Sequence, residues 1–210
     1  NEHQAYGIPF YTVGERLARL DEACEMLKRL WTEKKVTWKG KYYVLEDAPL
    51  EPKPVQRPYP ELMIGGGGEK VTLKIAAKHA DHWNVWGGPA TLAAKGKILD
   101  GHCDTVGRDP KKILRSAVMV LAMSDGAAEV EKLRKAYMAR LGADEEKARD
   151  TMLGGSVAQI SDPAFDTAAT TSRQWLKARI GTSMPNMSVI AVFMSQHSHV
   201  ARSLAFRARS

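Results

Sequence analysis

Residues 61–77 read Glu61-Leu-Met-Ile-Gly-Gly-Gly-Gly-Glu-Lys-Val-Thr-Leu-Lys-Ile-Ala-Ala77, with four glycines between an apolar run and a helical pattern. The run at 62–64 has the length of a buried strand. Apolar residues from 71 to 77, with lysines between them, predict a helix. A second strand-like run, His82-Trp-Asn-Val-Trp86, follows. Strand, glycine turn, helix and strand in about 25 residues is the minimum for a βαβ crossover.

Four glycines at this position can serve a ligand. Glycine adopts positive φ and lets the backbone approach a bound molecule closely. The helix that follows begins with unpaired N–H groups and a partial positive charge, so the turn predicts an anion site, to which Lys70 adds a full charge. The alternative is a tight turn that only lets helix and strand pack. The run is neither a phosphate-binding P-loop nor a dinucleotide fingerprint, because Gly-Lys-Ser/Thr and the distant acidic residue are both missing.

The rest of the chain alternates helical and strand-like patterns. Thr12 and Glu15 form a capping box before an amphipathic helix that ends near Thr32. The other expected elements are a hairpin at 36–45, helices at 90–106, 126–141 and 143–153, a buried strand at 113–123, a glycine break at 154–155, a short helix at 157–160 and a doubtful strand at 187–194. The arginine-rich end is expected to be irregular. Alternation of this kind predicts an α/β fold with a parallel sheet, either a small open sheet or part of an eight-stranded barrel.

Composition argues against several classes of protein. The net charge of +7 is uneven: residues 1–162 hold 25 basic and 23 acidic residues, whereas residues 163–210 hold 6 and 1. The body is therefore nearly balanced, and no specific nucleic acid partner is expected. No apolar run is long enough to span a membrane. Two distant cysteines without metal spacing suggest reduced thiols in the cytoplasm, and His197 with His199 is a weak metal pair, so no metal site is expected.

Seven motifs occur in an order that resembles a known family. They are Asn1-Glu-His-Gln-Ala-Tyr-Gly-Ile-Pro-Phe10, Val13-Gly-Glu-Arg-Leu-Ala-Arg-Leu-Asp-Glu-Ala23, Tyr42-Tyr-Val-Leu-Glu-Asp-Ala-Pro49, Glu51-Pro-Lys-Pro-Val-Gln56, Ile64-Gly-Gly-Gly-Gly-Glu-Lys-Val-Thr-Leu73, Ala80-Asp-His-Trp-Asn-Val-Trp86 and Val106-Gly-Arg-Asp-Pro110. Together they resemble the luciferase-like monooxygenase superfamily, in its coenzyme F420-dependent oxidoreductase branch. The resemblance covers residues 1–162.

The resemblance implies a (β/α)8 TIM barrel that holds F420, or FMN in relatives, at the carboxyl ends of its strands. It implies an enzyme that transfers hydride between this cofactor and a small organic substrate. The residues it points to for cofactor binding are Asn1, Glu2, Gly65, Gly66, Gly67, Gly68, Lys70, Asn84 and Trp86. Core packing is the alternative for Trp83 and Trp86, while His3 and His82 are expected to be structural. No catalytic acid or base is identified.

Two departures from the family bear on activity. The family carries roughly a hundred residues before the position of Asn1, with the first four of the eight strands. We therefore expect a partial barrel that self-associates through its unpaired edges or forms homo-oligomers. Residues 163–210 lack the family's acidic pattern and are treated as a divergent basic tail, for which a change of reading frame near Asp162 is a hypothesis. The alternatives to an F420-dependent oxidoreductase are an FMN-dependent monooxygenase, an inactive truncated barrel, and a basic-tail module for nucleic acid.

Overall fold

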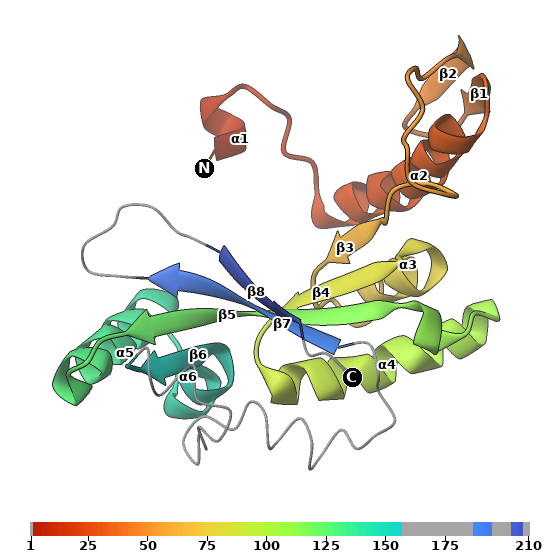
Figure 1. Cartoon of the computed structure of the whole chain (residues 1–210). Helices are drawn as coiled ribbons and strands as arrows, with labels where there is room; N and C mark the ends of the chain where they lie inside the picture. The colour runs from red at the N-terminus through yellow and green to blue at the C-terminus, as the bar shows by residue number, and fades with distance from the viewer. Residues whose placement is uncertain (1, 157–186, 195–202, 208–210) are drawn as a thin grey trace.

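The computed structural model describes residues 2–156, 187–194 and 203–207. Its helices and strands follow the chain in the order shown in Figure 1. They are α1 (Glu2–Ala5), α2 (Val13–Thr32), β1 (Val36–Lys39), β2 (Val44–Ala48), β3 (Met63–Gly65), α3 (Thr72–His79), β4 (His82–Trp86), α4 (Pro89–Val106), the 3-10 turn η1 (Pro110–Lys112), β5 (Leu114–Met123), α5 (Ala127–Leu141), α6 (Glu145–Thr151), β6 (Met152–Gly155), β7 (Met187–Met194) and β8 (Ser203–Arg207).

A six-stranded sheet organises the molecule. Its main path runs β3-β4-β5-β7-β8, and β6 pairs with β5 beside that path. The pairs β3–β4, β4–β5, β5–β6 and β5–β7 are parallel, whereas β8 runs antiparallel to β7. Within the described residues β3 and β8 are edge strands, so the sheet stays open. The expected α/β fold with an unclosed barrel is confirmed.

Helices α3 and α4 cover one face of β3, β4 and β5. Successive strand residues point to opposite faces, so every second residue packs beneath the helices. Ile64, Trp83, Val85 and Ala117 do so and are all buried. Leu73, Leu92 and Leu99 reach them from the helices. This core, built by the crossover that residues 61–86 predicted, is what holds the carboxyl ends of β3 and β4 in place.

Helix α2 and the β1–β2 hairpin form an outlying unit (Figure 1). The Thr12 hydroxyl accepts from the Glu15 amide at 3.3 Å, which confirms the predicted cap. The Glu22 carboxylate accepts from Trp38 Nε1 and from the amides of Tyr42 and Tyr43. A helix side chain therefore satisfies the amides at the tip of the hairpin, which fixes the two elements to each other.

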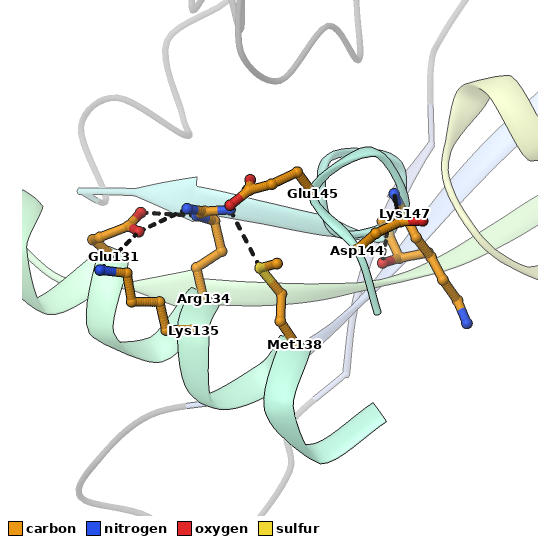
Figure 2. A network of polar contacts seen from close by, with 8 residues as sticks. Glu131, Arg134, Lys135, Met138, Asp144, Glu145 and Lys147 are labelled. Atoms are coloured by element: carbon orange, nitrogen blue, oxygen red, sulfur yellow. Dashed lines mark hydrogen bonds and ion pairs between the residues drawn. The ribbon is translucent and has the colours of Figure 1, made fainter. Parts of the chain in front are cut away.

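Charged contacts join α5 to α6, as Figure 2 shows. The Arg134 guanidinium donates to both oxygens of Glu131 on its own helix and contacts Glu145 in the first turn of α6. Asp144 caps α6 by accepting from the Lys147 amide at 2.8 Å. These contacts fix the start of the short helix that carries Asp150 to the site.

Two expectations about the second half are wrong. Residues 152–155 form β6 and pair with β5 at 120–123, where we expected the end of a helix and a glycine break. Residues 203–207 form β8, where we expected an irregular end. The doubtful strand at 187–194 is confirmed as β7. The expected helix at 157–160 and the pair His197 and His199 lie outside the described residues.

Candidate functional site

The face of the sheet opposite α3 and α4 carries three of the nine residues predicted to bind the cofactor, namely Gly65, Asn84 and Trp86. Gly65 pairs with Asn84, and Asn84 pairs with Ser116, so these three lie side by side across β3, β4 and β5. Trp86, two residues beyond Asn84, shares this face and is 49% exposed. We call Gly65, Asn84, Trp86 and Ser116 the open face.

A hydrogen-bonded chain fixes the Asn84 amide. Asn84 Nδ2 donates to Ser116 Oγ at 2.7 Å, and Ser116 Oγ lies 2.6 Å from His82 Nε2. Burial lowers the pKa of His82, while Glu61 acts weakly in the opposite direction, so the imidazole is neutral at pH 7. A neutral ring nitrogen can accept a hydrogen bond from the Ser116 hydroxyl, which leaves the Ser116 oxygen to accept a hydrogen bond from Asn84. His82 thus holds the Ser116 hydroxyl in place, and its structural role stays a prediction.

Residues 65–68, the glycine loop, connect β3 to the turn before α3. Gly66 has a φ of 127°, a conformation that L side chains rarely adopt. Its amide donates to the Asn84 carbonyl at 2.9 Å, and its carbonyl accepts from Trp83 Nε1 at 2.8 Å. A Cβ at Gly68 would stand only 2.7 Å from the Thr72 hydroxyl. Glycine is therefore required in this turn for two reasons: the chain reverses here, and Thr72 packs closely against the backbone.

Two helices begin near the ends of β3 and β4, and their first turns differ. At α4 the Asp150 carboxylate accepts from the amides of Gly88 and Ala90, at 3.1 and 3.0 Å, and from the Thr91 hydroxyl. At α3 the residue before the helix is Val71, and it supplies no side-chain cap. An internal carboxylate thus occupies the start of α4, while the start of α3, next to the glycine loop, retains amides for an external anion.

The structure unites some predicted residues and separates others. Lys70 lies exposed in the turn between the glycine loop and α3. Trp83 belongs to the core beneath the helices, whereas Trp86 does not. Glu2 is in α1, which Figure 1 places well apart from β3 and β4. Asn1 lies outside the described residues.

Sequence reasoning missed Ser116 and Asp150. Ser116 left a weak signal, since it and Arg115 are the only polar residues of β5, the strand that lies next to the strand of Asn84. Asp150 left none, because its partners at α4 lie 60 residues earlier in the chain and only the fold brings them together.

The open face and the glycine loop suit a flat, phosphate-bearing cofactor. A Cβ at Gly65 would have no heavy atom within 4 Å, so this glycine leaves space directly beside Asn84. Trp86 supplies an exposed aromatic surface, and the turn supplies amides and a lysine for an anion. Among the residues whose placement is described, no group of three His, Cys, Asp or Glu could hold a metal ion. The same part of the chain has no helix long and apolar enough to cross a membrane.

Comparison with known proteins identifies similar chains. The family model for luciferase-like monooxygenases matches residues 1–182. An F420-dependent glucose-6-phosphate dehydrogenase of Kineococcus radiotolerans is 36% identical over 102 residues, which are 49% of this chain and 27% of that protein. An FMNH(2)-dependent dimethylsulfone monooxygenase of Pseudomonas putida is 32% identical over 99 residues, 47% of this chain and 27% of that protein. A longer match, to the F420-dependent glucose-6-phosphate dehydrogenase of Microbacterium testaceum, is 27% identical and spans 87% of this chain but 43% of the relative.

Solved structures support the fold. An F420-dependent secondary alcohol dehydrogenase superposes with a TM-score of 0.61 and 21% identity, over 78% of this chain and 56% of that protein. An EDTA monooxygenase from Chelativorans sp. BNC1 superposes with a TM-score of 0.52 and 18% identity, over 65% of this chain and 38% of that protein. This chain therefore spans 27–43% of the length of these curated relatives and 38–56% of these solved chains.

Proposed function

Since the chain belongs to the luciferase-like monooxygenase family, we propose that it forms the cofactor-binding part of an F420-dependent oxidoreductase that acts on a small organic substrate. The observation that carries the proposal is the juxtaposition of the open face with the glycine loop, whose neighbouring helix start is uncapped. In this proposal Gly65, Asn84 and Trp86 contact the ring system of the cofactor. Gly66, Gly67, Gly68 and Lys70 hold its phosphate-bearing tail. Asn1 and Glu2 are proposed as ring contacts on the resemblance alone.

Each residue has a defined physical task in this proposal. The Ser116 hydroxyl holds Asn84 Nδ2, which leaves the amide oxygen of Asn84 to accept a hydrogen bond from a ligand N–H. Trp86 covers one side of a flat ring and excludes water there. The amides at the start of α3 and the Lys70 ammonium favour an anionic tail. A bound deazaflavin supplies the hydride chemistry, and the chain supplies its position and electrostatic surroundings.

An FMN-dependent monooxygenase is the second candidate, favoured by the similarity to the dimethylsulfone monooxygenase. Both cofactors present a planar ring and a phosphate, so the residues of the open face would serve either. The alternative of an inactive partial barrel follows from the share of the relatives that this chain spans. We further propose the cytoplasm as the compartment, since Cys24 and Cys103 are both free and buried thiols.

Titration separates these candidates. F420 and FMN are each added to the 210-residue chain and to the longest protein that its gene encodes, and quenching of cofactor fluorescence is followed. We expect saturable quenching, with F420 bound more tightly than FMN. Tighter binding of FMN would favour the monooxygenase. Absence of saturable quenching by either cofactor in both proteins would refute the proposal.

A further inference from the structure

Side chains on one side of the glycine loop hold two of its carbonyl groups and that of Glu69, the next residue. Trp83 Nε1 donates to the Gly66 carbonyl at 2.8 Å, and Lys95 Nζ donates to the Gly67 carbonyl at 2.8 Å. His102 Nε2 lies 2.7 Å from the Glu69 carbonyl, which can only accept, so this ring nitrogen carries a proton. Lys95 and His102 stand two turns apart on α4 and therefore share one side of that helix. The carbonyls of Gly66, Gly67 and Glu69 are thus turned toward the core and α4, whereas the Gly68 carbonyl accepts from the Leu73 amide of α3.

The geometry of the peptide bond then sets the direction of the amides. In a planar trans peptide the N–H of one residue points opposite to the C=O of the residue before it. Because the carbonyls of Gly66, Gly67 and Glu69 face the core and α4, the amides of Gly67, Gly68 and Lys70 face away. None of these three amides donates to another described residue. They are consequently available to an anion on the side of the loop away from α4.

Lys95 holds the central one of these three carbonyls, that of Gly67. Besides the Gly67 carbonyl, its ammonium contacts Glu69 Oε1 at 2.9 Å. Its stem lies against the Gly67 α-carbon: a Cβ there would come within 3.1 Å of Lys95 Cε and 3.2 Å of Val85 Cγ2. The Lys95 ammonium therefore lies on the α4 side of the glycine loop, and the Glu69 carboxylate beside it offsets its charge.

We propose that Lys95 is a positioning residue, which holds the Gly67 carbonyl and thereby orients the Gly68 amide toward the cofactor's anionic tail without binding that tail itself. The inference rests on the proposed function. The inference adds that a lysine of α4 arranges the amide donors of the loop before the ligand arrives. Binding is tighter when the donors are already arranged. Neither the glycine pattern nor Lys70 carries that information.

The first test compares Lys95→Met with Lys97→Met, which removes the same charge from an exposed position of the same helix. The amide order parameter of Gly68, measured by 15N relaxation without cofactor, should fall from about 0.85 toward 0.6 or below in Lys95→Met only. F420 should bind Lys95→Met about tenfold more weakly, the factor expected if one loop in ten keeps the binding arrangement. Lys97→Met should match the wild type in both measurements.

A second variant separates position from charge. Lys95→Met combined with Glu69→Gln removes one positive and one negative charge beside the glycine loop, so the local net charge stays the same. If Lys95 acts through position, the double variant stays as weak as Lys95→Met. Wild-type affinity in the double variant, or unchanged order parameters in Lys95→Met, would overturn the inference while leaving the proposed function intact. If neither the 210-residue chain nor the longest protein that its gene encodes binds F420 or FMN, the proposed function fails first and the positioning role fails with it.

Discussion

At the scale of single residues, the glycine loop works through peptide planes and empty space. Gly67 lets the Lys95 stem approach the backbone, whereas Gly65 keeps open the space beside Asn84. The four glycines are therefore not equivalent. A Cβ at Gly67 presses against Lys95 and Val85, whereas a Cβ at Gly65 has no atom of the described residues within 4 Å and lies on the open face.

Gly65→Val should accordingly separate binding from stability. Valine suits a strand, and nothing within 4 Å opposes its Cβ, so the melting temperature should change little. Cofactor affinity should fall at least about tenfold, which corresponds to about 1.4 kcal/mol, because the new methyl groups occupy the space next to Asn84. Gly14→Val makes the same change at another unobstructed glycine and should not affect binding. Equal affinity in Gly65→Val would place the ligand elsewhere.

His79, the last residue of α3, is buried where this helix packs against α2. Its Nε2 lies 2.6 Å from Asp21 Oδ1, and Glu25, Lys28 and Lys78 surround it. Burial lowers the pKa of His79 below its usual 6.5, while the hydrogen bond to Asp21 acts in the opposite direction. The unfolded chain therefore binds a proton more readily than the folded one. Stability should be full above pH 6.5 and fall as the pH drops below that value.

Thermal melting across this pH range tests the assignment. The wild-type melting temperature should fall by a few degrees as the pH is lowered from 7.5 to about 5.5. His79→Gln should be less stable at pH 7.5 and show a flatter pH dependence. His3→Gln, which makes the same substitution at an exposed histidine of α1, is the matched control. A wild-type slope in His79→Gln would assign the pH dependence to other groups.

At the scale of elements, α4 links three parts of the site. Its first turn is capped by Asp150 of α6, its middle holds the glycine loop through Lys95, and Asp100 near its end pairs with the buried Arg115 of β5. A backbone shift of this helix would reach the loop directly. A shift of α6 that moved α4 would therefore also move Lys95 relative to the proposed anion site.

Asp150→Ala tests this connection. The first-turn amides of α4 lose their acceptor, which should cost about 1–2 kcal/mol and lower the melting temperature by roughly 2–8 °C. Arg149→Ala, at the exposed neighbouring position, should be close to neutral. If the capping carboxylate also excludes external anions, Asp150→Ala should gain weak phosphate binding at Gly88 and Ala90, visible as amide shifts in NMR titration. A wild-type melting temperature would show that solvent replaces the cap without loss.

Predictability from sequence follows the range of the interactions that form each element. Helices α2, α3 and α4 and strands β3, β4 and β5 carry their own caps, periodicity or glycine punctuation, and each was predicted within a few residues. Strand β6 was missed because Met152-Leu-Gly-Gly155 has no strand pattern of its own and depends on pairing with β5. Strand β8 was missed although Leu204 and Phe206 alternate with smaller or polar residues. In the site, the glycine loop was predicted, whereas Ser116, Asp150 and Lys95 act through contacts that no local pattern encodes.

At the scale of the whole molecule, the described part of the chain exposes surfaces that a closed barrel would cover. Strand β3 pairs on one side only, and its Met63 is 53% exposed. The segment before α2 carries Tyr6, Ile8, Phe10 and Tyr11, and α2 begins with Val13, all at least 38% exposed. An unpaired strand edge next to apolar side chains is a template for association with another chain. The same features would accept further strands of a longer protein.

We therefore expect the 210-residue chain to self-associate on its own. Sedimentation velocity should show a species that grows with concentration. Met63→Lys, which places a charge on the edge strand, should reduce that growth without altering the circular dichroism spectrum. Val55→Lys makes the same change at an 86% exposed residue away from the sheet and should have no effect. A monodisperse monomer at every concentration, with one cooperative melting transition, would show that the open sheet is a complete fold and would remove the argument that its edge needs a partner.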